Sequence, residues 1–279
     1  MSRALVAAML AAAALTSGRD FAVAHARRVD AAAGGVAQGR PFGAASGVAQ
    51  GRRYGGQPVL SNPAYDGQFT FVRLRYGPPT QYVSQGLPWS HDYPIGERHF
   101  MAIMNEVSLL HPKTVETSIL ALDEPDLFRH PIAYMAEPGY WAISDREAAA
   151  FRSYLLKGGF VIFDDFSEQR GGWGHFEAAF RRVLPEAVFF DLDASHSIFH
   201  AFFEITSFDI LPQAYDIGRP VLRGVFEQND PSKRLMAMIN YNTDISEYWE
   251  TAGTGWRPNW ETNEAYKLGV NYIIYGLTH

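Results

Sequence analysis

Two adjacent aspartates, Asp164 and Asp165, end the apolar stretch KGGFVIFDDF at residues 157–166. The stretch follows a glycine pair and is too short for a helix, so it predicts a strand that is buried on both faces. In an open parallel sheet, ligands bind beyond the carboxyl ends of the strands. Because neighbouring side chains on a strand face opposite ways, we expect one aspartate to bond backbone N–H groups of the following loop. The other, Asp165, is expected to face the ligand crevice.

Histidines elsewhere in the chain add further candidate chemistry. Asp164 or Asp165 together with His196 would supply a general acid and a general base, so these three residues are the catalytic candidates. His196 and His200 also follow Asp191 and Asp193, a combination that suits a divalent metal. Such a histidine pair binds one metal only on a helix, and the neighbouring phenylalanines favour packing instead. We therefore predict no metal site and no cofactor, with a divalent metal as the alternative.

Arg73 and Arg75 lie on the same face of the first expected strand. Their guanidinium groups are suited to binding a carboxylate or a phosphate. The alternative is an internal ion pair with Asp92, Asp164 or Asp165. Aromatic and polar side chains of the expected loops complete the predicted ligand-binding set, which comprises Trp89, Asp92, Asn242, Asp244 and Trp249.

Composition excludes several classes of function. The chain has no cysteine, which rules out disulfides, thiolate nucleophiles and zinc sites with cysteine ligands. The chain has 24 Lys+Arg and 30 Asp+Glu residues. Residues 1–53 contain seven of the basic residues and only two of the acidic ones, so the remaining chain is strongly acidic. An acidic domain is repelled by phosphate backbones, and nucleic acid is therefore not an expected partner.

The N-terminal residues have the layout of a secretory signal peptide. Arg3 precedes the apolar run Ala4 to Leu15, and Ala-x-Ala cleavage sites follow, so residues 1–26 are predicted to be removed on export. An uncleaved membrane anchor is the alternative. Residues 27–66 are rich in Gly, Ala and Arg and contain the hexapeptide GVAQGR twice, which predicts a disordered linker.

The rest of the chain, residues 67–279, alternates between strand and helix patterns. A capping box at Ser144 and Glu147 predicts one helix start, and apolar residues at helical spacing predict the other helices. Strands are expected at 69–76, 115–122, 132–135, 160–163, 188–191, 221–227 and 235–241. Helices are expected from about 96 to 110, from 144 to 157, from 174 to 184 and from 264 to 275. This alternation predicts one α/β domain with a mostly parallel sheet.

Several segments together resemble the bacterial domain-of-unknown-function family 4159 over about residues 67–279. The segments are FVRLRYG with PWSHDYP, HPIAYMAEPGYWAISDREAAAFRSYLLKGGFVIFDDF, RLMAMINYNTDISEYWE and AYKLGVNYIIYGLTH. The resemblance implies a glutamine-amidotransferase-like α/β domain with a flavodoxin-like, doubly wound sheet, and often an exported protein. This chain differs from the family pattern at one point: it has His196-Ser197 where relatives tend to have His-Pro. Because an amidotransferase of this type needs a cysteine nucleophile, thiol-dependent glutamine hydrolysis is excluded.

We therefore expect an exported domain of the cell envelope, periplasmic or secreted, without an integral membrane span after cleavage. The missing nucleophile and the acidic, aromatic loops favour a non-catalytic binding or interaction module. Its partner would be an envelope protein or a small polar ligand such as a saccharide. The alternative is a hydrolase or carbohydrate-processing enzyme that uses Asp164 or Asp165 with His196, assisted by a metal.

Overall fold

The computed structural model describes residues 57–58, 61–78, 82–83, 86–208 and 218–279. The expected signal peptide and most of the expected linker lie outside these residues. The last part of the expected linker belongs to the described structure and contacts the domain. The side-chain amide of Asn62 donates to Ile119 O at 2.9 Å and its oxygen accepts from Ile119 N at 2.8 Å. Ordered contacts therefore begin before residue 67, because Asn62 pairs with the backbone of an edge strand.

The centre of the domain is a seven-stranded sheet with the order β4-β2-β5-β6-β9-β8-β7. The first five strands in this order are parallel, whereas β8 is antiparallel to β9 and β7 is antiparallel to β8. The strands are β2 (Val72–Arg75), β4 (Ser118–Ala121), β5 (Ile132–Ala136), β6 (Phe160–Phe166), β7 (Phe190–Asp191), β8 (Val221–Phe226) and β9 (Leu235–Tyr241). A separate antiparallel pair joins β1 (Gln57–Pro58) to β3 (Tyr82–Val83).

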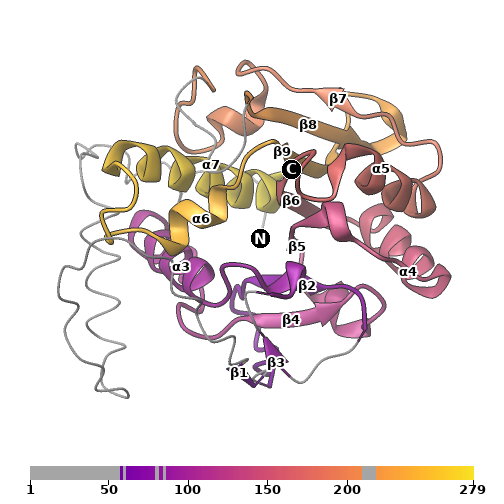
Figure 1. The fold of residues 1–279 in the computed structure, drawn as a ribbon, viewed down its shortest axis with the longest axis horizontal. Helices are drawn as coiled ribbons and strands as arrows, with labels where there is room; N and C mark the ends of the chain where they lie inside the picture. Colours follow the sequence, from indigo (N-terminus) through magenta and orange to yellow (C-terminus); the bar gives the residue numbers. More distant parts are fainter. Residues whose placement is uncertain (1–56, 59–60, 79–81, 84–85, 209–217) are drawn as a thin grey trace.

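Helices cover both faces of the sheet (Figure 1). One face packs against α4 (Asp145–Leu156) and α5 (Gly172–Val183), and the other against α3 (Ile95–Val107), α6 (Ile245–Glu250) and α7 (Asn259–Thr278). Each face has its own apolar cluster, so the sheet separates two cores. The prediction of a single α/β domain with a mostly parallel sheet is confirmed.

Local sequence signals explain where several elements begin and end. The Ser144 hydroxyl accepts from the backbone of Glu147, and the Glu147 carboxylate accepts from the backbone of Ser144, so the predicted capping box starts α4. All seven residues of β6 are buried, as expected for a strand covered on both faces. The strand extends through both aspartates to Phe166, three residues beyond the predicted end.

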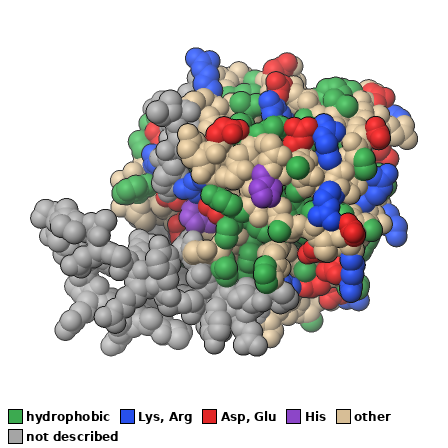
Figure 2. All heavy atoms as spheres, turned by 45° about the vertical axis from the view of Figure 1, so that its right-hand side comes forward, with side chains coloured by type: hydrophobic (Ala, Val, Ile, Leu, Met, Phe, Trp, Pro, Cys, Tyr) green, Lys and Arg blue, Asp and Glu red, His purple; other side chains and the backbone are tan. Residues whose placement is uncertain are grey.

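None of the helices in the described part of the chain is both long enough and apolar enough to cross a membrane. On the face drawn in Figure 2, acidic and basic side chains are mixed with apolar ones. The acidic excess of the domain therefore does not form a single-sign patch on that face. Among the described residues, a group of buried carboxylates lies in the interior, at the carboxyl ends of the parallel strands.

Candidate functional site

A turn inside β6 sends the two adjacent aspartates to different surroundings. Asp165 has a φ of 62°, in the left-handed region, and the pairing of β6 with β9 shifts register between Phe163 and Phe166. Aspartate tolerates this conformation better than most residues do. Both side chains are nevertheless buried, with exposed fractions of 0% for Asp164 and 1% for Asp165.

Asp164 is a structural residue that connects β5, β9 and α6. Its carboxylate accepts from Tyr134 Oη at 2.8 Å and from Asn240 Nδ2 at 3.0 Å. It also accepts from the backbone of Ile245 at 3.1 Å and of Ser246 at 3.2 Å. We expected one aspartate to bond backbone N–H groups of the loop after β6, and the structure differs: the N–H groups that Asp164 accepts from belong to the start of α6.

Asp165 contacts His91, which lies in the loop after β2. His91 follows the short 3-10 helix η3 (Pro88–Ser90), and its Nδ1 forms a hydrogen bond with Asp165 Oδ2 at 2.9 Å. The same nitrogen lies 3.5 Å from Asp92 Oδ1. Arg73 holds this loop in place, because its guanidinium donates to Trp89 O at 3.2 Å and to His91 O at 2.8 Å.

The last member of the group, Asp244, precedes α6. Its Oδ1 accepts from Glu247 N at 2.9 Å, so Asp244 is the N-cap of this helix. Its Oδ2 is buried and has no hydrogen-bond partner among the described residues. The Ser246 hydroxyl lies 2.7 Å from Asp92 Oδ2 and 3.1 Å from Asp244 Oδ1, which ties the two aspartates together.

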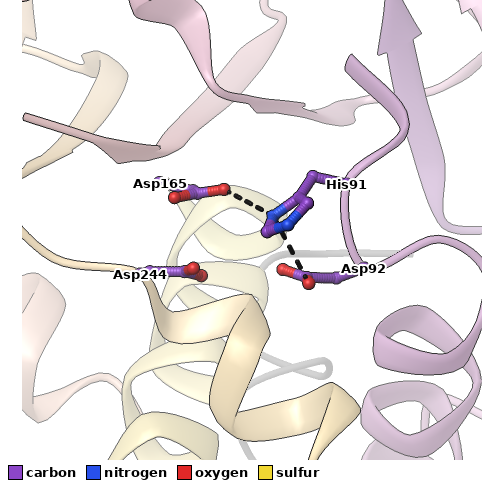
Figure 3. A group of neighbouring side chains, drawn as sticks. All are labelled: His91, Asp92, Asp165 and Asp244. Carbon is purple, nitrogen blue, oxygen red and sulfur yellow. Dashed lines mark hydrogen bonds and ion pairs between the residues drawn. The ribbon is translucent and has the colours of Figure 1, made fainter. Parts of the chain in front are cut away.

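These residues form a compact group, the edge cluster: His91, Asp92, Asp165 and Asp244 (Figure 3). One nitrogen or oxygen atom from each residue lies within 4.8 Å of those of the other three. The side chains converge from three segments: the loop after η3, the carboxyl end of β6, and the turn between β9 and α6. Asp92 also shares a group with Glu247 and Glu250, whose carboxylate oxygens lie within the same distance of each other.

Burial and like charge dominate the electrostatics of the edge cluster. Burial, followed by the negative charge of Asp244, raises the pKa of both Asp92 and Asp165 well above the usual range. Burial lowers the pKa of His91, but its bond to Asp165 and the charge of Asp92 outweigh burial and raise that pKa to about 10. Burial and the charge of Asp244 raise the pKa of Asp164 to about 7.

An ion pair lies over one side of the edge cluster. Arg170 Nη1 is 3.0 Å from Asp165 Oδ1 and 3.0 Å from Glu137 Oε1. Burial raises the pKa of Glu137.

The loops that carry Glu137 and Arg170 cross at Gly139 and Gly171, where a Cβ on Gly171 would lie 2.2 Å from the backbone of Gly139. Gly171 also has a φ of 81°, so glycine is required there by both space and conformation.

The sequence profile of the family described as "Domain of unknown function (DUF4159)" matches residues 70–277. The chain belongs to this family. The match covers the seven-stranded sheet, every residue of the edge cluster and the helices named above, apart from Thr278 at the end of α7. A comparison with curated proteins gives no match. The function of this DUF4159 domain must therefore be inferred from its own residues.

Several residues of the predicted ligand-binding set are structural in this DUF4159 domain. Arg73 forms a buried ion pair with Glu97, which is not one of the three aspartates expected as its internal partner. Trp249 is buried and stacks on Phe100 with 4.2 Å between ring centroids. Trp89 is buried as well. None of these three side chains presents an accessible group to a ligand.

The remaining predicted residues are distributed around the fold. Arg75 forms a partly exposed ion pair with Glu124 at 3.5 Å. Asn242 follows β9 and donates to Arg219 O at 3.0 Å. His196 packs against Phe226 and Tyr275, at the edge of the sheet opposite the edge cluster. The structure therefore does not bring His196 to Asp164 or Asp165.

Two features that build the edge cluster of this DUF4159 domain were missed from the sequence. His91 was not selected, although it adjoins Asp92 in the loop after the first strand, where a ligand group is expected. The helix α6 was predicted as a loop. The available signal was Asp244 followed three residues later by Glu247, a pattern typical of a helix N-terminus.

Proposed function

We propose that this protein is an exported binding domain that takes a positively charged ligand at the carboxyl edge of its sheet. The observation that carries the proposal is the edge cluster, in which three buried carboxylates converge and Asp244 Oδ2 has no hydrogen-bond partner among the described residues. A buried carboxylate oxygen without a partner is costly, and a cationic ligand would remove that cost.

The surrounding charges support a cation and oppose an anion. Glu247 and Glu250 add carboxylates beside Asp92, and Glu137 adds another near Asp165. Among the described residues, the cationic groups in ion pairs with these carboxylates are the His91 imidazole, which belongs to the cluster, and the Arg170 guanidinium beside it. Carboxylates outnumber these cations, so a phosphate or a carboxylate ligand would meet net repulsion.

The fold supports the same location. The part β4-β2-β5-β6 of the strand order follows that of a flavodoxin-like or amidotransferase-like sheet, which we propose for this domain, whereas β9, β8 and β7 extend the sheet differently. In such sheets ligands bind beyond the carboxyl ends of the strands, near the point where the strand order reverses. The cluster lies at the ends of β2, β6 and β9. With no cysteine nucleophile in the chain, a binding role is the simpler proposal.

Thermal unfolding with paired ligands tests this function. The full chain, first dialysed against a chelator, is mixed at constant ionic strength with Mn²⁺, spermidine or glucosamine, and with N-acetylglucosamine as the neutral match for glucosamine. We expect at least one cationic ligand at 100 times its Kd to stabilise the protein by about 2.7 kcal/mol, a Tm rise of roughly 5–10 °C.

The variant Asp244→Asn is the control, because asparagine keeps the N-cap through Oδ1 and replaces only the unpaired oxygen. Stabilisation should be lost in this variant. Stabilisation by N-acetylglucosamine alone, or equal stabilisation of wild type and variant, would contradict the proposal.

The proposal includes export, which the N-terminal sequence supports. Residues 1–26 have the charged start, the short apolar run and the Ala-x-Ala sites of a signal peptide. We expect the exported protein to begin near Arg27, and N-terminal sequencing of material from the periplasmic and secreted fractions measures this. Recovery of the intact Met1 terminus in the membrane fraction would favour the uncleaved anchor instead.

A further inference from the structure

We propose that the cation is a divalent metal ion, bound by His91 Nδ1 and by one carboxylate oxygen each from Asp92, Asp165 and Asp244. This inference rests on the proposed cationic ligand and names its chemical class. It is carried by the mutual distances of the four atoms, by their near-complete enclosure and by the unpaired oxygen of Asp244.

The distances fit one ion. Zn²⁺ and similar metals lie about 2.0–2.2 Å from nitrogen and carboxylate oxygen ligands, so two ligands on opposite sides of one ion are about 4.0–4.4 Å apart. The four atoms of the edge cluster lie within 4.8 Å of one another. Small side-chain rotations would therefore complete the site without movement of the backbone.

The backbone of the cluster is already fixed by contacts outside it. Arg73 holds the His91 carbonyl at 2.8 Å. The N-cap bond to Glu247 fixes Asp244, and the Ser246 hydroxyl contacts Asp92. Preorganised ligands of this kind reduce the ordering cost of binding.

Asp244 supplies an independent indication of a ligand. The residue is 2% exposed, and its Oδ2 has no hydrogen-bond partner among the described residues. Figure 3 shows its carboxylate directed toward His91 and Asp92, in the space that the other members also face. A buried carboxylate oxygen with this orientation and without a hydrogen-bond donor is expected of a metal ligand.

Enclosure favours a bare ion over an organic cation. Asp92 is 0% exposed and Asp165 is 1% exposed, whereas the His91 side chain is 20% exposed. An ammonium group would have to bring its carbon chain through the space between these side chains. A metal ion requires no such space, and its remaining coordination position would face the partly exposed side at His91.

The donor set narrows the choice of metal. One imidazole nitrogen with three carboxylate oxygens suits Mn²⁺, Zn²⁺ or Fe²⁺, whereas Ca²⁺ and Mg²⁺ prefer sites made entirely of oxygen. With neutral His91, three carboxylates leave a divalent ion with a net charge of −1 in the site. We therefore use Mn²⁺ and Zn²⁺ as probes.

Titration calorimetry and metal analysis of the full chain, after chelator treatment at pH 8, test the inference. We expect one tightly bound equivalent per chain. Asp244→Asn and His91→Gln should each weaken binding at least 100-fold. Matched controls are Asp193→Asn and His196→Gln, whose side chains lie away from the edge cluster, and their affinities should equal that of the wild type.

Spectroscopy separates direct ligation from an effect on folding. The Mn²⁺-loaded protein should show nitrogen couplings in pulsed electron paramagnetic resonance that disappear in His91→Gln, while circular dichroism shows that the metal-free variant is folded. Metal binding that Asp244→Asn and His91→Gln leave unchanged would overturn the inference. Binding of spermidine or glucosamine that depends on Asp244, without metal binding, would overturn it and leave the proposed function standing. Absence of any cation binding would overturn both.

Discussion

We expect replacement of Arg73 with Met to lower the free energy of unfolding by about 4 kcal/mol, because it removes one partner of a buried ion pair. Arg73 and Glu97 have side-chain exposures of 1% and 0%, so the variant leaves the Glu97 carboxylate buried without its counter-ion. The carbonyls of Trp89 and His91 lose their guanidinium donor as well. Urea unfolding at pH 7 measures the loss.

The same strand provides a matched control. Arg75→Met removes an ion pair to Glu124 whose side chains are 18% and 39% exposed, and a pair of this kind contributes less than about 1 kcal/mol. The double variant Arg73→Met/Glu97→Leu should recover about half of the loss, because no charge then remains buried. Equal losses for Arg73→Met and Arg75→Met would contradict the structural role of the Arg73–Glu97 pair.

Raising the pH from 5 to 8 in the presence of a chelator should destabilise the protein. Burial raises the folded-state pKa of Asp92 and Asp165 and brings that of Asp164 to about 7, whereas an unfolded aspartate has a pKa of about 3.9. A raised carboxyl pKa stabilises the folded state fully below about pH 4, and this contribution is lost as the pH rises through the folded pKa. For Asp164 alone, linkage gives a loss of about 4 kcal/mol by pH 8.

His91 does not change this result within that range. Its folded pKa is raised to about 10, so its contribution is complete below its unfolded pKa of about 6.5 and is lost on the way to pH 10. Between pH 6.5 and 8 it adds to the decline and does not oppose it. Urea unfolding at pH 5, 6, 7 and 8 in chelator measures the slope, and a stability that increases over this range would contradict the prediction.

A bound divalent cation should reverse the decline. Mn²⁺ at 1,000 times its Kd adds about 4 kcal/mol at pH 8, because it binds the folded state alone. At pH 5 protons occupy the same oxygens and the gain should be smaller. In Asp244→Asn the cation should add little to the free energy of unfolding at any of these pH values. This comparison distinguishes binding of the cation at the edge cluster from a general effect of salt on stability.

The location of the site was predictable because it depends on local signals. The apolar run before Asp164 and Asp165 predicts a buried strand, and a parallel sheet places the end of that strand where ligands bind. The division of roles between the two aspartates followed from the alternation of a strand. The actual directions of the two side chains depend on the left-handed backbone conformation of Asp165. No residue pattern in the stretch indicates that conformation.

The partners of Asp165 were not predictable in the same way. His91 and Asp244 are distant from Asp165 in sequence, and only the order of the strands brings their loops together. The exposure of side chains is also a tertiary property. Trp249 was expected in an exposed loop, but α6 turns it onto Phe100 in the core. Sequence patterns indicate which groups are available, whereas tertiary packing decides which of them meet.

The position of β9 has a consequence for the order of events during folding. This strand is the last of the sheet strands along the described chain, yet it lies between β6 and β8 in the middle of the sheet. Asp244 follows it directly, so the edge cluster cannot assemble until β9 has entered the sheet. Contacts across such sequence separations form slowly, because a long loop must close first. A growing chain would therefore present Asp92 and Asp165 as ordinary solvated acids, and the complete edge cluster would form only after β9 has paired with β6.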